Sequence, residues 1–365
     1  MLLSLILWFI SIWLEYFVYR KLQQAGISPV IRNLFVCWAL FWFIAFIFRN
    51  HIIFFLRLPE PFRLSEISGG LCITWIIITI LAFMGFMIVN ILTGFKPFTK
   101  RKVLFSVMLT CAGVVWCLLE AYFVQTREIT IKTHKLPEGR DRIRITYITD
   151  LHLGGIYTSL HFDRVMRLIE ESSPDIFIMC GDIFDGNMSY WTQEISRLSR
   201  AAKSAPLGAF AVNGNHENDY MLTRYYDDFI NILRESGFKL LSDERADTGG
   251  LVIIGVEDRK NKFHSWIKFL LTPEDADKFV LVIKHRPYLP QDAQGNFDLQ
   301  LSGHTHGGQF WPVGYYRSWL EGWIPQGLSK NSGGYIYVSN GAGYNGPCMR
   351  LFAPPEVTVI DLVRE

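Results

Sequence analysis

Four long apolar runs occupy the N-terminal third of this chain. They lie at about residues 2–19, 34–56, 67–95 and 103–124 of a chain of 365 residues. The third run carries no charged residue and exceeds the roughly 20 residues that cross a bilayer. Buried helices of a large soluble core are the alternative interpretation. We favour a four-helix transmembrane bundle over residues 1–125 and a second domain over residues 126–365.

Few charged side chains interrupt the apolar runs. Glu15 lies within the first run, Arg49 and His51 break the second, and Glu120 lies near the end of the fourth. Charges near a helix end can reach the membrane interface, so they are compatible with spans. The first run lacks the basic start and small-residue exit of a signal peptide. Glu15 and Glu120 are candidate functional positions, because intramembrane carboxylates often have a function.

Basic residues are unevenly distributed among the loops that join the runs. The loops after the first and third runs contain basic residues and no acidic residue: Arg20, Lys21, Arg32, Lys96, Lys100, Arg101 and Lys102. The middle loop mixes both signs. The positive-inside rule then predicts a multi-pass protein whose second domain is extracytoplasmic. Arg127, Lys132 and Lys135 beyond the fourth run oppose this orientation.

Net charge and cysteine usage narrow the possible partners. The net charge is +2, so we expect no nucleic-acid partner. The apolar runs make the lipid bilayer an expected partner. Four of the six cysteines lie in the apolar runs. The sequence therefore contains neither a disulfide framework nor a Cys-x-x-Cys metal site.

The second domain alternates predicted strands and helices. Apolar segments at 143–149, 176–180, 207–212, 251–256, 279–283, 297–302, 334–339 and 357–362 are typical of strands. Helical stretches are expected near 160–172, 189–203 and 222–236. This order predicts a layered α/β domain with sheets inside and helices outside.

Polar side chains gather where these strands end. In open α/β sheets, ligands bind at the carboxyl ends of the strands. The residues at these positions are Asp150, His152, Asp182, Asn215, His216, His285, His304 and His306. Two carboxylates, an amide and several imidazoles suit Mn, Zn or Fe and exclude a thiolate site. Seven ligands exceed the needs of one ion, so the sequence predicts two divalent metal ions that share a carboxylate.

Five short blocks carry a resemblance to a known superfamily. "DLH", "GDIFD", "GNHE", "KHRP" and "GHTH" occur in this order between residues 150 and 306. This arrangement resembles the calcineurin-like metallophosphoesterases. "GHTHGGQ" and "CMRLFAPPEVTVI" are similar to the membrane-attached bacterial YkuE-type branch. The resemblance covers roughly residues 141–365 and implies a four-layer α/β/β/α sandwich.

The resemblance also implies a role for each residue of the blocks. One metal ion would be bound by Asp150, His152 and His306, and the other by Asn215, His285 and His304. Asp182 would bridge both ions. His216 would be the catalytic residue, facing the substrate phosphate and assisting the leaving oxygen. Asp185 and Glu217 would orient other groups rather than bind metal.

The predicted activity is hydrolysis of a phosphoester, with hydroxide held between the two ions as the attacking group. A membrane-anchored enzyme favours a phosphodiester or a lipid-linked phosphate as substrate. A UDP-diacylglucosamine-type lipid diphosphatase is one alternative. A membrane sensor or scaffold with a structural metal site is the other, and the presence of His216 argues against it.

Two arginines and one aromatic segment remain outside this assignment. Arg286 and Arg350 are candidate substrate-binding residues. Residues 310–323 contain six aromatic residues, including Trp311, Trp319 and Trp323. The segment is interpreted either as a loop packed over the sheet edge or as a surface that contacts lipid headgroups.

Overall fold

The chain forms two compact units. The computed structural model describes residues 2–56, 64–153, 159–185, 191–220, 226–258, 267–289, 296–331 and 333–365. One unit, the helical unit, comprises Met1–Leu119 with Gly346–Met349. The other, the α/β unit, comprises Glu120–Asn345 with Arg350–Glu365. The functional division expected at residue 125 stays a prediction.

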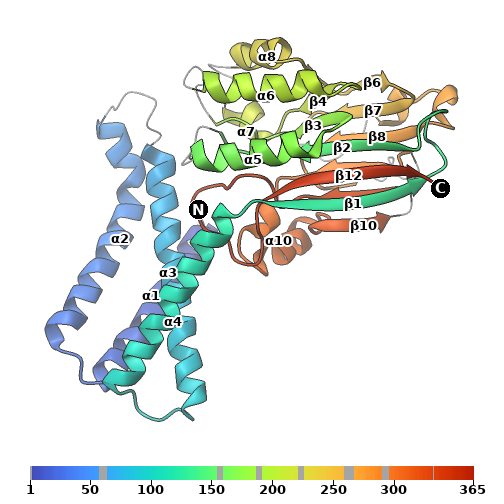
Figure 1. Cartoon of the computed structure of the whole chain (residues 1–365). Helices are drawn as coiled ribbons and strands as arrows, with labels where there is room; N and C mark the ends of the chain where they lie inside the picture. Colours follow the sequence, from blue (N-terminus) through green and yellow to red (C-terminus); the bar gives the residue numbers. More distant parts are fainter. Residues whose placement is uncertain are drawn as a thin grey trace. The chain divides into compact units, whose positions relative to one another are not determined.

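Four helices build the helical unit: α1 (Leu2–Gln24), α2 (Pro29–Leu56), α3 (Leu64–Leu92) and α4 (Lys100–Tyr122) (Figure 1). Aromatic rings join α2 to α3. The Trp42 ring stacks on Trp75 with centroids 6.4 Å apart, and Trp38 meets Trp75 edge-on at 6.0 Å. The turn between α3 and α4 is closed by Phe86 stacked on Phe98.

Two of these helices are long and apolar enough to cross a membrane. Within the described residues, the segments that qualify are Gly70–Leu92 and Lys100–Tyr122, with mean hydropathies of 2.6 and 2.1. The prediction of a bundle of four spans is therefore not confirmed. The side chains of Arg49 and His51, and the loop at 57–63 that entered the orientation argument, lie outside the described residues.

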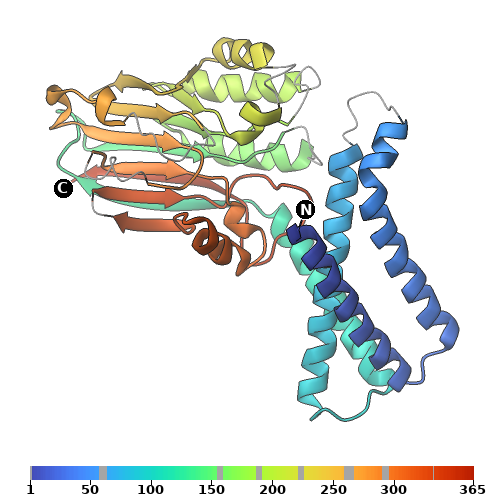
Figure 2. The ribbon, with the colours of Figure 1, turned by 180° about the vertical axis from the view of Figure 1, so that it is seen from behind.

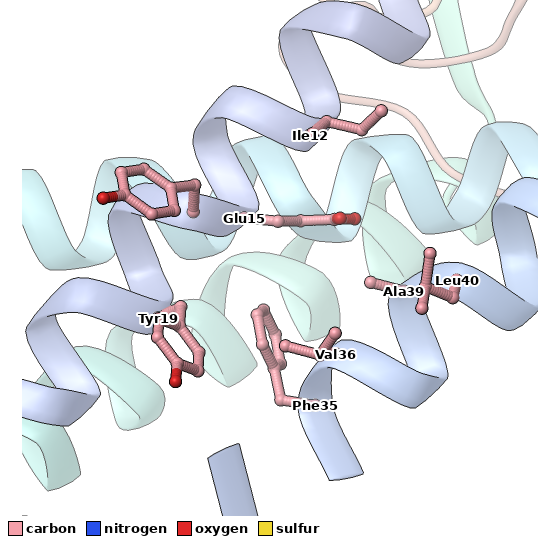
Figure 3. A pocket seen from close by; sticks show the side chains of 8 residues that line it. Ile12, Glu15, Tyr19, Phe35, Val36, Ala39 and Leu40 are labelled. Atoms are coloured by element: carbon pink, nitrogen blue, oxygen red, sulfur yellow. The ribbon is translucent and has the colours of Figure 1, made fainter. Parts of the chain in front are cut away.

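Glu15 is one of the buried polar residues of the helical unit. It projects into an apolar pocket of about 320 Å³ lined by α1 and α2 (Figure 3). Its Oε1 accepts hydrogen bonds from Trp75 Nε1 at 2.9 Å and from Ser11 and Thr79 at longer distances. A buried carboxylate needs such donors. Glu15 thus links α1 to α3.

The α/β unit contains two six-stranded sheets. The first has the order β1-β12-β2-β3-β4-β5 and the second β10-β11-β9-β8-β7-β6. The strands of the first sheet are β1 (Gln125–Thr133), β2 (Arg142–Ile148), β3 (Ile176–Cys180), β4 (Ala209–Val212), β5 (Phe238–Leu240) and β12 (Glu356–Arg364). Those of the second are β6 (Glu244–Thr248), β7 (Leu251–Val256), β8 (Phe279–Lys284), β9 (Leu299–Ser302), β10 (Gly327–Asn331) and β11 (Gly334–Val338).

Three apolar cores hold the layers together. The central core lies between the sheets and joins Ile145 and Ile178 to Ile253 and Leu299. A second core lies between the first sheet and the helices α5 (Ser159–Ser172), α6 (Thr192–Ser204) and α8 (Tyr226–Glu235), which cover one face in Figures 1 and 2. The third covers the outer face of the second sheet and includes Ile267 of α9 (Ile267–Leu270). The expected α/β sandwich is therefore confirmed.

Side-chain periodicity explains which helix faces are buried. On α5, the side chains of Phe162, Val165, Met166 and Ile169 are buried, at spacings of three and four residues. This is the spacing of one helical face. In contrast, every residue of β3 is buried because the strand lies between two layers.

Several short elements escaped the sequence analysis. They are α7 (Asn215–Tyr220), α10 (Val313–Glu321), β5, β6 and β10. β10 has an exposed, polar pattern rather than an apolar one, so hydrophobicity gave no signal for it. The start of the helix expected at 189–203 and of that expected at 222–236 lies outside the described residues.

Candidate metal centre

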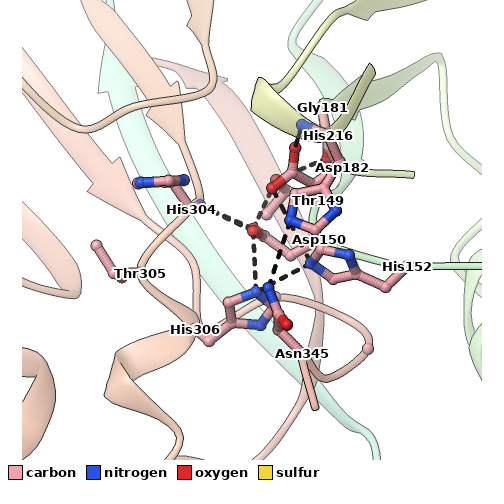
Figure 4. Close-up of polar contacts among 12 residues, drawn as sticks. Thr149, Asp150, His152, Gly181, Asp182, His216, His304, Thr305, His306 and Asn345 are labelled. Carbon is pink, nitrogen blue, oxygen red and sulfur yellow. Dashed lines mark hydrogen bonds and ion pairs between the residues drawn. The ribbon is translucent and has the colours of Figure 1, made fainter. Parts of the chain in front are cut away.

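The predicted site residues converge at the carboxyl ends of five strands. Asp150 and His152 follow β2, Asp182 follows β3, Asn215 and His216 follow β4, His285 follows β8, and His304 and His306 follow β9. β2, β3 and β4 are parallel neighbours, as are β8 and β9. Parallel neighbours end at the same edge of a sheet, which brings these loops together (Figure 4).

The first group of potential ligands contains Asp150, His152 and His306. All three are buried, and their ligand atoms lie within 4.8 Å of one another. His152 Nε2 is 3.1 Å from His306 Nε2, and His306 Nε2 is 3.4 Å from Asp150 Oδ1. The Asp150 carboxylate is oriented by the backbone N–H of His304 and the hydroxyl of Thr149.

The second group contains Asp182, His285 and His304, with ligand atoms again within 4.8 Å. His285 Nε2 lies 3.1 Å from Asp182 Oδ2. Asn215 Oδ1 is buried and has no hydrogen-bond partner among the described residues. A buried amide oxygen without a donor is costly in a folded protein, and a cation would satisfy it.

Asp182 connects the two groups. Its Oδ2 lies 3.1 Å from His285 Nε2 of the second group and 4.0 Å from His152 Nε2 of the first. Its Oδ1 accepts the backbone N–H of His216 at 2.8 Å. Asp182 also belongs to a third possible ligand group with His152 and His216. A carboxylate in this position suits a bridge between two ions.

The donor set fits divalent cations. His285 Nδ1 donates to the carbonyl of Cys180 at 2.8 Å, which turns Nε2 towards the Asp182 carboxylate. His152 Nδ1 donates to Asp185 Oδ2 at 3.0 Å, which turns its Nε2 towards His306. Imidazole nitrogens and carboxylate oxygens that converge in this way are ligand types that divalent Mn, Zn and Fe accept.

Burial and neighbouring charges shift the pKa values of the imidazoles in the site. Burial lowers the pKa of His285, but the charge of Asp182 raises it to about 10. Burial and the charge of His285 lower the pKa of His304 to about 2, which keeps this ligand neutral. The charge of Asp182 thus favours a positive neighbour at His285, whereas His304 stays neutral.

The backbone of the site is held in an unusual conformation. Five of the predicted ligands have a positive φ: Asp150, His152, Asp182, His304 and His306, with values between 50° and 70°. Residues other than glycine rarely adopt this region, and each instance costs about 1–3 kcal/mol. The clustering of these conformations at one site supports a functional role, and no sequence pattern had indicated it.

Glycines in the blocks provide space for the ligands. A Cβ atom on Gly214 would collide with the Asp182 carboxylate, and one on Gly303 with Asp150 and Thr149. Gly181 has a φ of +79°, and a Cβ there would collide with the backbone of Gly214. The glycines beside the ligands thus permit the close approach that the sequence predicts.

Glu217 fixes two of the ligand loops. Its fully buried carboxylate accepts backbone N–H groups of Asp182 at 2.9 Å, Ile183 at 2.7 Å and Gly214 at 2.8 Å. It therefore orients the loops after β3 and β4 rather than binding metal, as the sequence indicates.

Asp185 links His152 to His216. Its Oδ2 accepts from His152 Nδ1 at 3.0 Å and its Oδ1 from His216 Nδ1 at 2.6 Å. Burial raises the pKa of Asp185, but the two histidines lower it well below its usual range. Burial likewise lowers the pKa of His216, while the hydrogen bond to Asp185 and the charge of Asp182 raise it to about 9. Because Nδ1 of His216 is bonded to Asp185, its Nε2 is the ring nitrogen that faces Asn345.

Of the two arginines predicted to bind substrate, Arg350 differs from the expectation and Arg286 stays a prediction. Arg350 is fully buried, and its guanidinium donates to the carbonyls of His306, Ala353, Asn340 and Gly343. The prediction that Arg350 contacts substrate is therefore wrong, because its donors are directed into the protein. Arg286 forms an ion pair with buried Asp258 at 3.1 Å and remains near His304.

Two neighbours of the site were missed in the sequence. Asn345 Nδ2 lies 3.4 Å from His216 Nε2, and Gln309 holds the backbone of Asn345. Trp323 meets the His304 ring edge-on at 4.9 Å. Asn345 falls outside all five blocks, so the sequence contained no signal for it.

Similarity to known proteins agrees with this geometry. Residues 143–308 match the calcineurin-like phosphoesterase family. An uncharacterized metallophosphoesterase of Aquifex aeolicus is 38% identical over 254 residues, which cover 67% of this chain and 94% of the relative. YkuE of Bacillus subtilis, also an uncharacterized metallophosphoesterase, is 28% identical over 256 residues, 67% of this chain and 87% of that protein.

A third relative extends over the helical unit as well. A Danio rerio transmembrane protein with metallophosphoesterase domain is 24% identical over 388 aligned residues, which cover 96% of this chain and 86% of the relative. The chain belongs to the calcineurin-like metallophosphoesterases. It is a metal-dependent phosphohydrolase with groups of His and Asp that can hold metal ions.

Proposed function

We propose that this chain is a membrane-anchored two-metal phosphohydrolase that cleaves a phosphodiester or a lipid-linked phosphate. The observation that carries the proposal is the pair of ligand groups joined by Asp182, with the Asn215 oxygen unsatisfied beside them. One ion would be held by Asp150, His152 and His306. The other would be held by Asn215, His285 and His304, and Asp182 would contact both.

Two divalent ions bound in this way supply an activated water and neutralise charge on the phosphoryl group. The remaining tasks belong to side chains of this chain. Asp185 holds His152 and His216 in fixed orientations, and Glu217 holds the loops that carry Asp182 and Asn215. A site fixed before substrate arrives needs little reorganisation during the reaction.

His216 is the proposed acid. Its Nδ1 is hydrogen-bonded to Asp185, and its Nε2, which lies 3.4 Å from Asn345 Nδ2, would donate to the leaving oxygen. Burial lowers the pKa of this imidazole, but the hydrogen bond to Asp185 and the charge of Asp182 raise it above its usual value, which favours the protonated form. This argues against a scaffold with a merely structural metal site, because a structural site has no use for a protonated histidine beside its ligands.

Membrane anchoring rests on two findings. Within the described residues, Gly70–Leu92 and Lys100–Tyr122 qualify as spans, and the Danio rerio relative that covers nearly the whole chain is named a transmembrane protein. An enzyme held at a membrane has lipids as its most concentrated phosphoesters. We therefore propose a phosphodiester or lipid-linked phosphate in preference to a freely diffusing phosphomonoester.

The test uses the full chain in detergent, stripped of metal and reloaded with Mn, Zn or Fe. Two ions per chain and turnover of bis-p-nitrophenyl phosphate are expected. The variants D182N and H216A should lose turnover, whereas H134A should retain it, because His134 is exposed and pairs with Glu365. Binding of two ions without turnover of any phosphoester would support the scaffold, and binding of no metal would refute the proposal.

A further inference from the structure

Helix α10 exposes an unusual number of aromatic side chains. The exposed fractions are 77% for Trp319, 58% for Tyr316 and 49% for Tyr315, with Trp311 at 55% just before the helix. Phe352 is 65% exposed. The strand segments that carry Trp311 and Phe352 are joined by a bridge between Phe310 and Leu351 and by the hydrogen bond from Trp311 N to Leu351 O. We call these five side chains the α10 surface.

The segment that carries Phe352 of the α10 surface contacts Glu120, the first residue of the α/β unit. Glu120, in the last turn of α4, accepts the backbone N–H of Ala353 at 2.8 Å. Ala353 directly follows Phe352 of the surface. Strand β1 begins at Gln125, only two residues after α4 ends at Tyr122. Glu120 and Ala353 both belong to the α/β unit, so this hydrogen bond brings the segment after Phe352 to the residues that connect the candidate span to β1.

The opposite side of α10 supports the metal centre. Gly314 packs so closely on Gly307 that a Cβ atom would collide with its carbonyl. Trp323, which follows the helix, is only 9% exposed and contacts His304. Because Trp323 is buried, it does not belong to the exposed aromatic surface. Helix α10 thus has one face towards the His304–His306 loop and the other towards solvent.

We propose that the α10 surface inserts into the headgroup region of the lipid bilayer and sets the His304 side of the metal centre beside the lipid phosphates. Tryptophan and tyrosine favour this region because their rings are partly apolar and their N–H or O–H groups need water or headgroup partners. An exposed aromatic patch of this kind is uncommon on a soluble surface. The proposal rests on the membrane anchoring proposed above.

Photolabelling tests insertion without requiring catalysis. The full chain is reconstituted into phosphatidylcholine vesicles that contain a phospholipid with a photoreactive group near its glycerol. Labelled peptides should include residues 311–320 as well as the spans. Phe269 of α9, 69% exposed on another part of the α/β unit, provides the control and should remain unlabelled. Labelling confined to the helical unit would overturn the proposal.

Activity on matched substrates tests the consequence for catalysis. A triple variant, W311S/Y316S/W319S, is compared with F269S on bis-p-nitrophenyl phosphate and on a bilayer-embedded p-nitrophenyl ester of phosphatidic acid. We expect turnover of the embedded ester to fall about tenfold or more in the triple variant, with turnover of the soluble ester unchanged. F269S should match the unaltered chain on both substrates.

The other outcomes are distinguishable. Equal loss on both substrates would mean that α10 only supports the fold, and no loss on either would mean that the surface does not face lipid. Each of these would overturn the inference while leaving the phosphohydrolase in place. If the unaltered, metal-loaded chain cleaves neither ester while photolabelling of 311–320 persists, the proposed function fails and the docking surface stands.

Discussion

The two ligand groups of the metal centre differ in their access to solvent. Asp150, His152 and His306 are all buried, with exposures of 0%, 2% and 6%. In the second group, Asn215 and His304 are partly exposed, although Asp182 and His285 are buried. The contrast indicates a closed first group and a second group that opens towards substrate. We expect an ion at the first group to be held more firmly than an ion at the second.

The hydrogen-bond acceptors that orient the histidines of the two ligand groups differ as well. A carboxylate, Asp185, accepts the Nδ1 proton of His152, whereas a neutral carbonyl, that of Cys180, accepts the Nδ1 proton of His285. A carboxylate partner raises the basicity of a metal-binding histidine more than a carbonyl does. We therefore expect tighter binding at the first group.

Substitution of Asp182 should weaken metal binding at both ligand groups, because this residue lies between them. We expect D182N to lower turnover of bis-p-nitrophenyl phosphate by about 10³-fold, since it removes the shared charge. Both binding steps in a metal titration should weaken together. Weakening of only one step would mean that Asp182 does not bridge. D163N, at an exposed position paired with Arg197, is the control.

Substitution of His216 should leave metal binding at both ligand groups unchanged and reduce the hydrolysis of phosphoesters. We expect H216A to lower turnover by about 10²-fold, as is usual when a general acid is lost. Elemental analysis should still find two ions per chain, because His216 is not a proposed ligand. Loss of an ion in this variant would instead indicate that His216 binds metal, as its proximity to His152 and Asp182 allows.

Removing the negative charge of Asp185 should reduce the difference in metal affinity between the two ligand groups. We expect D185N to weaken the tighter metal-binding step by roughly 10- to 100-fold, the usual cost of losing a carboxylate behind a histidine ligand. The weaker step should change little. Competition with a fluorescent chelator measures both affinities, and unchanged tight binding would contradict the proposed support of His152.

The smallest effect is expected at Trp323, which contacts only the second group. Edge-on ring contacts contribute about 0.5–1.5 kcal/mol, so W323L should weaken the second binding step roughly threefold to tenfold. The first step should not change. W319L provides the matched control in detergent, because Trp319 lies on the exposed face of α10. An equal effect of W319L would point to a general disturbance of the helix.

The sequence predicted the candidate site well because its residues lie in short local blocks. His304 and His306 are two residues apart, and each block follows a strand whose apolar pattern is evident. Ligand loops of this kind are set by local chain geometry. Asn345 and Trp323 were missed because their proximity to His216 and His304 depends on long-range packing.

The same distinction applies to the fold. Buried strands such as β3 and β8 were recognisable from continuous apolar runs, whereas β10 is exposed and polar. Arg350 shows most clearly what a local sequence pattern cannot predict. Nothing in its neighbouring residues indicates that its guanidinium donates to four backbone carbonyls. The prediction of four spans stays unconfirmed, since two segments qualify within the described residues and hydropathy alone cannot distinguish a span from an apolar helix of a soluble core.

The position of β12 affects how the first sheet can fold while the chain is being synthesised. β12 lies between β1 and β2 and pairs with both, yet it is synthesised after every other described strand. β12 is the one partner of β1 among the described strands. β1 therefore remains unpaired until the ribosome has synthesised β12, after the other strands of the α/β unit. The candidate spans precede all of this. The proposed membrane anchor would therefore leave the ribosome before the first sheet can close, and the unpaired strands of the nascent α/β unit are prone to aggregation during that interval.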